Sequence, residues 1–118
     1  MMSSLETVMN ALIAVSKEVY HYTAPANSKR YIVWAEDSEY ASLEADNYKP
    51  GQTLEGTIDL FTKDEDDEYI SAIPTALNAA RIGWELNSVK YEDETRFIHY
   101  EWLFRVRQYY GDHINQGI

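Results

Sequence analysis

Apolar side chains recur at two different spacings along this chain of 118 residues, and the spacing predicts the element in each segment. Over residues 4–18, Leu5, Val8 and Leu12 are three or four positions apart, which places them on one face of a helix. Ser3 and Glu6 have the spacing of a capping box at the start of this helix. We therefore expect a first helix over residues 4–18 that packs through one apolar face.

A second helix is predicted after the acidic run 64–68. Ile70, Ile73 and Leu77 follow this run at helical spacing, and the carboxylates before them suit the positive N-terminal end of a helix. Pro74 lacks an amide hydrogen, so it either kinks the helix or begins its second half.

Alternation of apolar and polar residues predicts four strands, over residues 30–36, 53–62, 82–91 and 97–107. The alternation is strongest in the last of these strands. Its residues predicted to face the core are Ile98, Tyr100, Trp102, Phe104 and Val106, and those predicted to face outward are His99, Glu101, Arg105 and Arg107. Trp34 and Trp84 lie in alternating strands like Trp102, so we expect all three tryptophans in the core.

The connecting segments complete the expected fold. Residues 20–25 form an extended exit from the first helix, 37–52 is a polar loop too long for a tight hairpin, and 91–96 is a turn. Residues 108–118 have no period and are expected to form a flexible tail. The order α-β-β-α-β-β predicts an α+β fold, with an antiparallel sheet and two helices packed on one face. The length suits a single domain, 1–118.

The charge balance narrows the classes of partner. Ten basic and twenty acidic residues give a net charge of −10, which repels phosphate backbones and anionic membranes. We therefore expect no direct nucleic-acid binding and no membrane binding. The absence of cysteine excludes disulfides, cysteine-ligated zinc and thiol catalysis, and it is typical of a reducing cytoplasm. We expect neither a signal peptide nor a membrane span, because the N-terminal segment lacks a basic start and an apolar run of 18 residues.

Candidate chemistry is sparse. His21, His99 and His113 lack the spacing that clusters metal ligands on a helix. A calcium loop counted from Asp64 would need glycine and glutamate where Tyr69 and Thr75 stand. The chain has no phosphate-cradling glycine loop and no hydrolase signature. We therefore expect no metal, no cofactor and no enzymatic activity.

Aromatic residues outside the predicted core favour protein docking instead. Four tyrosines lie in the loop or the tail, and tyrosine is enriched in protein interfaces. Leu103 is an apolar residue on the outward face of its strand, beside Glu101 and Arg105. The candidate interface residues, taken from the loop, the acidic run, the outward face and the tail, are Asp37, Glu39, Tyr40, Tyr48, Asp64, Asp66, Asp67, Leu103, Arg105, Tyr109 and Tyr110.

Five segments, each about as long as a strand or a turn, carry a resemblance to a known protein family. They are YHYTAP (20–25), YIVWAED (31–37), GTIDLFTK (56–63), IGWELNSVKYE (82–92) and IHYEWLF (98–104). Over nearly its whole length the chain resembles small tail-terminator and tail-completion proteins, also called head-tail joining or minor capsid proteins, of long-tailed phages and Gram-positive prophages. The resemblance carries no catalytic motif, and it transfers no single functional residue.

The resemblance implies a structural assembly protein of the phage neck or tail. Such a protein is assembled in the host cytoplasm and forms a ring, commonly a hexamer. The ring caps the tail tube and joins it to the head, so tail-tube and head-connector proteins are the implied partners. An acidic ring would not hold the DNA that passes through it. Like charge also predicts weaker assembly at low salt.

Two other readings remain open from the sequence. The chain could be an acidic phage-encoded inhibitor that mimics DNA and blocks a host enzyme, or an enzyme whose pocket has no sequence signature. Genes for portal, connector and tail-tube proteins beside this gene would favour the assembly protein. An isolated early gene would favour the inhibitor.

Overall fold

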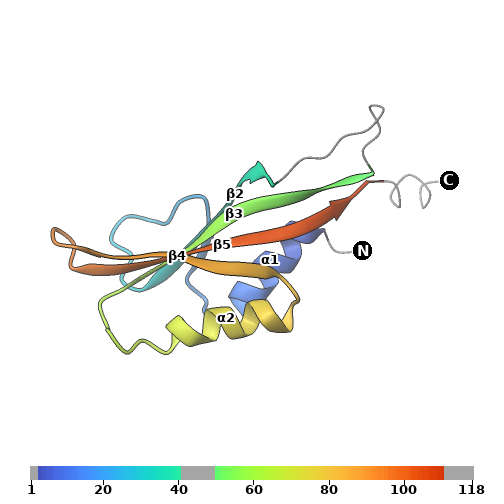
Figure 1. Cartoon of the computed structure of the whole chain (residues 1–118). Coiled ribbons are helices and arrows are strands. Elements are labelled where there is room, and N and C mark those ends of the chain that lie inside the picture. Colours follow the sequence, from blue (N-terminus) through green and yellow to red (C-terminus); the bar gives the residue numbers. More distant parts are fainter. Residues whose placement is uncertain (1–2, 41–49, 111–118) are drawn as a thin grey trace.

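One sheet carries both helices on the same face (Figure 1). The computed structural model describes residues 3–40 and 50–110. Along the chain the elements are α1 (Ser4–Ile13), β1 (Val19–His21), β2 (Tyr31–Glu39), β3 (Gly51–Thr62), α2 (Tyr69–Ala79), β4 (Gly83–Glu92) and β5 (Phe97–Tyr109). We call the covered side of the sheet the helix face and the other side the outer face. The predicted α+β class, with two helices on one face of a mainly antiparallel sheet, is confirmed.

The strand order in the sheet is β1-β2-β3-β5-β4. The β2–β3, β3–β5 and β5–β4 pairs are antiparallel, as predicted. The sequence analysis missed β1, which it treated as an extended exit. This strand of three residues pairs parallel with β2, from Val19 beside Ile32 to His21 beside Trp34. The sheet is therefore mixed. The order of the elements along the chain is α-β-β-β-α-β-β.

The first helix begins as predicted and ends early. Ser3 and Glu6 form the capping box, with each side chain bonded to the other residue's backbone amide. The helix ends at Ile13 instead of residue 18. Ser16, which is buried, accepts a hydrogen bond from the amide of Glu18 at 3.0 Å. Such local bonding competes with helical bonding and turns the chain into β1.

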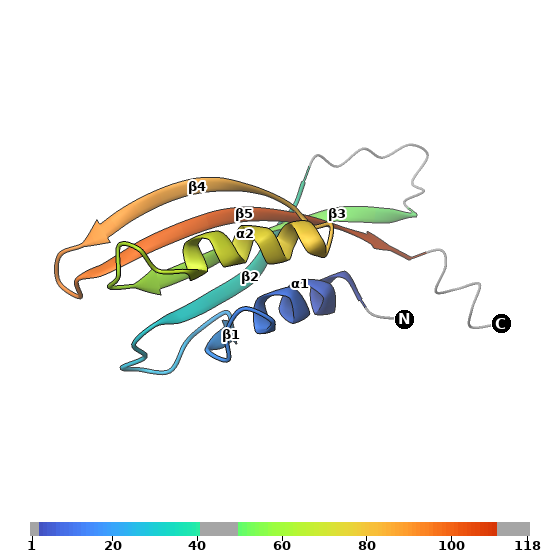
Figure 2. The same cartoon turned by 90° about the horizontal axis from the view of Figure 1, so that it is seen from below.

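The core lies between the two helices and the helix face. Its buried apolar residues are Val8, Ala11, Leu12, Ile32, Trp34, Ile58, Leu60, Ile73, Leu77, Ile82, Trp102, Phe104 and Val106. The predicted inward direction of Trp102, Phe104 and Val106 is confirmed. Ile98 and Tyr100 are only half-buried. The β4–β5 hairpin projects past the N-terminal end of α2 (Figure 2), and Tyr100 packs at the margin of the core.

Strand β5 is longer than predicted, which corrects the start of the tail. It continues to Tyr109, where it pairs with Gly51. The amide oxygen of Gln108 accepts a hydrogen bond from the Ser4 hydroxyl at 2.7 Å, and the Tyr110 amide bonds to the Pro50 carbonyl at 2.8 Å. Residues 108–110 are thus joined to the sheet, while residues 111–118 lie outside the described part. Within that part, no helix is long and apolar enough to cross a membrane.

Candidate functional site

Three of the predicted interface residues meet on the outer face, and we call Tyr40, Leu103 and Arg105 the outer-face patch. Arg105 is held between strands, with Nε 2.7 Å from Oε2 of Glu55 and Nη2 3.0 Å from Oε1 of Glu85. Its guanidinium carbon lies 3.9 Å from the centre of the Tyr40 ring. The patch therefore consists of two residues of β5 and Tyr40, which directly follows β2, and ion pairs to β3 and β4 hold Arg105 in place.

Leu103 lies in the middle of this face. It pairs with Thr57 on β3 and Glu85 on β4, and it is half-buried although both helices are on the other side of the sheet. The predicted outward direction of Leu103 is confirmed. An apolar side chain among fixed ion pairs suits the desolvated centre of a docking surface, because the rigid charges need little ordering when a partner binds.

The other described residues predicted from the polar loop and the tail lie toward the end of the sheet where β5 ends, which we call the terminal end. Asp37 is exposed and Glu39 is half-buried in β2, while Tyr48 lies outside the described residues. Tyr109 and Tyr110 are exposed, and the Tyr110 hydroxyl donates to Oε1 of Gln52 at 3.0 Å.

The acidic run lies at the opposite end, beside the β4–β5 turn, which we call the hairpin end. Thr62, two residues before the run, is seven residue steps along β3 from Glu55, which binds Arg105, and these steps span about 23 Å of strand. Asp64 and Asp66 are exposed there. A single compact partner segment therefore cannot cover both the acidic run and the outer-face patch.

The prediction that Asp67 belongs to the interface is wrong, because its carboxylate is buried inside the protein. Only 4% of Asp67 is exposed. The carboxylate accepts hydrogen bonds from the Thr62 hydroxyl at 2.5 Å and the Tyr69 amide at 2.8 Å, and Arg30 lies 3.3 Å away. These bonds fix the entry to α2, so Asp67 has a structural role and is not available to a partner.

An apolar surface that the sequence analysis assigned to the core lies along β4. We call Trp84, Leu86, Val89 and Tyr91 the edge stripe; their exposed fractions are 37%, 50%, 48% and 60%. They face the helix side, opposite Phe104, Trp102, Tyr100 and Ile98 of β5. The prediction that Trp84 is a core residue is therefore wrong. It is half-exposed, and its indole Nε1 donates to Oδ1 of Asn78 at 2.8 Å.

A bulge keeps the edge stripe on one face. The β4–β5 register shifts between Leu86 and Ser88, so Asn87 is the extra residue. Without the bulge, Val89 and Tyr91 would point to the outer face. The signal was present in the sequence, because the apolar spacing changes from two to three residues between Leu86 and Val89.

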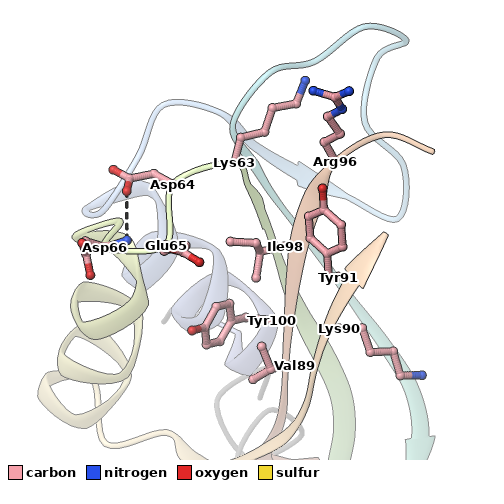
Figure 3. Close-up of a pocket in the computed structure, with 10 residues that line it drawn as sticks. All are labelled: Lys63, Asp64, Glu65, Asp66, Val89, Lys90, Tyr91, Arg96, Ile98 and Tyr100. Atoms are coloured by element: carbon pink, nitrogen blue, oxygen red, sulfur yellow. Dashed lines mark hydrogen bonds between the residues drawn. The ribbon is translucent and has the colours of Figure 1, made fainter. Parts of the chain in front are cut away.

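An open groove continues the edge stripe at the hairpin end (Figure 3). Val89, Tyr91, Ile98 and Tyr100 supply its apolar surface. The rim combines carboxylates and one lysine of the β3–α2 segment with basic residues of β4 and the β4–β5 turn; these are Asp64, Glu65, Asp66, Lys63, Lys90 and Arg96. The groove is wide and bears charges of both signs, which suits a protein segment better than a small molecule.

The outer face at the hairpin end carries a histidine bound to a carboxylate. His99 Nε2 donates to Oδ1 of Asp59 at 2.6 Å, and Nδ1 lies 3.6 Å from Glu92. The hydrogen bond to Asp59 raises the pKa of His99, and Glu92 and Glu101 act in the same direction. The ring stacks on Phe61 with centroids 4.2 Å apart. His99 therefore joins β3 to β5 on the outer face.

Asp59, His99 and Glu101 could supply three metal ligands from one place in the described chain. The bond between His99 and Asp59 already satisfies both partners, so an ion would have to displace it. The arrangement is explained by this bond alone, and the expectation of no metal stays a prediction.

The comparisons with known proteins include a likeness to solved structures, while the two sequence comparisons found no match. No protein-family model matches the sequence, and no curated protein matches it. Among solved structures, a chain of the "Virion of native gene transfer agent (GTA) particle" is similar, with a TM-score of 0.56 and 15% sequence identity. The match covers 92% of this chain and 92% of that chain. The two chains therefore share a fold over almost their whole lengths.

Proposed function

We propose that this protein is a structural subunit of a phage-like virion, located at the neck or tail. In this role it caps the tail tube and joins it to the head as a subunit of a ring, without catalysis. The observation that carries the proposal is the fold shared with a chain of a gene transfer agent virion, which extends over 92% of both chains.

The described surfaces support a role in assembly. The chain has the edge stripe on β4 and, separate from it, the outer-face patch around Leu103. Contiguous exposed apolar groups are uncommon on monomers and mark protein contacts. A ring subunit needs different surfaces for its neighbour and for the next ring along the particle. The edge stripe and the outer-face patch are two such surfaces.

Gene deletion and complementation test the proposal in the host that makes the particles. Deletion is expected to give heads without tails, or tails of uncontrolled length, in electron micrographs. Complementation with the unchanged gene should restore normal particles, and Leu103→Asp should fail to restore them because it buries a charge in the docking surface. Intact particles from the deletion strain would refute the proposal.

A matched control separates docking from folding. Ser71→Asp adds the same charge at an exposed position in the first turn of α2, where a carboxylate is favoured. It should restore normal particles. The purified Leu103→Asp protein should keep its thermal unfolding midpoint within a few degrees of the unchanged protein. Normal particles formed with Leu103→Asp would place the docking surface elsewhere.

A further inference from the structure

The long edge strand β4 carries the edge stripe, and along one side its backbone pairs with no other strand in the described part of the chain. In the described part of the chain, β5 pairs with one side of β4 and no strand pairs with the other. A strand edge of ten residues beside exposed Trp84 and Leu86 would aggregate if it were left open, and natural proteins normally shorten or charge such edges. β4 has a bulge at Asn87 and an exposed Lys90, but it keeps its length and its apolar groups, which suit it to receiving another strand.

The opposite edge of the sheet has a partly open strand as well. β1 covers β2 only from Ile32 to Trp34, so within the described residues no strand lies on that side of residues 35–38. β2 is antiparallel to β3, β3 to β5 and β5 to β4. β4 therefore runs opposite to β2. If a second copy is placed beside the first in the same orientation, its β2 edge meets β4 antiparallel.

The charges at the two edges are complementary when copies are placed this way. At the terminal end, Arg81 is exposed two residues before Gly83, and Asp37 is next to Ser38, which lies in the same row of the sheet as Gly83. At the hairpin end, the turn residues Asp93 and Glu94 are exposed, and the exposed Lys17 precedes Val19 of β1, which lies in the same row of the sheet as Val89. Lys29, which precedes β2 at that same end, is also exposed.

Apolar residues of α1 could contact the edge stripe of a neighbouring copy where the two sheets meet. α1 lies beside the β1 edge, and α2 lies nearer β4 (Figure 2). The exposed apolar residues of α1 are Met9 and Ile13, with exposed fractions of 37% and 50%. In the side-by-side arrangement, α1 of the second copy lies on the same side of the sheet as the edge stripe.

We propose that β4 of one copy pairs antiparallel with the β1–β2 edge of a second copy, so that identical chains join head to tail through their sheets. The partner is therefore another copy of this chain. This inference deepens the proposed function and rests on it for its biological role. A symmetric pairing of two β4 strands fits less well. It would place the turn carboxylates Glu92, Asp93 and Glu94 against Arg81, and it would bring two bulges together at Asn87. In the proposed pairing, the bulge of β2 between Glu36 and Ser38 and the bulge of β4 at Asn87 lie in different rows of the sheet.

Because the chain contains no cysteine, cross-linking at single introduced cysteines tests the pairing. Ser38→Cys on β2 and Glu85→Cys on β4 both lie toward the terminal end. Mixing these two variants with a short bis-maleimide should give covalent dimers well above the amount from either variant alone. Ser38→Cys mixed with Glu94→Cys is the control, since roughly 23 Å of strand separates Glu85 from the β4–β5 turn.

Each other outcome overturns the inference. Dimers from Glu85→Cys alone, as abundant as from the mixture, would indicate symmetric β4 pairing. Equal cross-linking of the control mixture would indicate the wrong strand direction. No cross-link, both in concentrated protein and in cells that produce the particles, would mean that the edges do not meet. The experiments belong at ~0.15 M salt, where the Debye length of about 8 Å weakens repulsion between copies of charge −10.

Two sets of variants test which side chains hold the paired edges together. Leu86→Asp should lower the yield of the cross-linked mixture roughly tenfold, while Ser71→Asp should leave it unchanged. Lys29→Glu and Glu94→Lys should each lower it, and both changes in the same chain should restore it, because the pair is re-formed with reversed charges. An additive loss in the double variant would show that these residues do not meet.

The pairing and the proposed virion role can fail separately. Cross-linking of purified protein reports on the edges whether or not the protein belongs to a particle. Normal particles from the deletion strain, together with specific Ser38–Glu85 dimers, would remove the virion role and keep the pairing. Defective particles from the deletion strain without those dimers would keep the virion role and remove the pairing.

Discussion

Gly56 and Phe104 are directly opposite each other on β3 and β5, and the Phe104 ring occupies the space that a side chain on residue 56 would need. A Cβ on residue 56 would lie 2.6 Å from Cε2 of Phe104. Phe104 is fully buried, so its ring has little freedom to move aside.

Gly56→Ala should therefore destabilise the fold by about 1–3 kcal/mol, since it forces an extra carbon into a packed core. Urea unfolding followed by tryptophan fluorescence measures the change. Gly83→Ala is the matched control. The nearest atom to a Cβ there is the Arg105 carbonyl oxygen at 3.7 Å, an ordinary contact, and the change should be within ~0.5 kcal/mol. Equal losses in both variants would contradict this account of the core.

Trp102 and Trp84 should differ in their contribution to stability, although both occupy alternating positions of neighbouring strands. Trp102 is 2% exposed, and Trp102→Ala should cost ~3–5 kcal/mol of unfolding free energy. Trp84 is 37% exposed at the sheet edge, and Trp84→Ala should cost ~1–2 kcal/mol. Chemical denaturation of the two variants compares them. A larger loss for Trp84→Ala would show that the edge stripe belongs to the monomer's core.

The bond between His99 and Asp59 should make stability depend on pH. Because Asp59 raises the pKa of His99 above its ordinary value of 6.5, the protonated ring stabilises the folded state most below pH 6.5. This contribution is lost as the pH rises through the higher pKa of the folded protein. The free energy of unfolding should therefore fall across that interval, and denaturation at a series of pH values measures it.

Substitution of the carboxylate checks the cause of that pH dependence. Asp59→Asn should lower the pKa of His99 in an NMR titration and flatten the fall in stability. Asp37→Asn removes the same charge from an exposed position on β2 and should leave the His99 titration unchanged. If the two variants shift the His99 pKa equally, the net charge of the protein, and not Asp59, is responsible.

Local sequence patterns correctly predicted the features that depend only on residues close together in the chain. The capping box of Ser3 and Glu6 formed as expected, because its partners lie within one helical turn. The alternation in β5 correctly oriented Trp102 and Phe104 toward the core and Leu103 away from it. Side chains alternate along any strand, so this orientation needs no knowledge of the strand order.

The tertiary structure alone decided which of these faces is covered. Trp84 and Phe104 have the same alternation in sequence, but β4 is at the edge of the sheet and β5 is inside it, so only Phe104 is buried. Asp67 belongs to an acidic run in sequence, and folding brings Arg30, which is 37 positions away in the chain, within 3.3 Å of its buried carboxylate. Burial depends on contacts between segments distant in the chain. The sequence therefore determined the direction of the side chains, and the packing of the sheet determined which of them remain available to a partner.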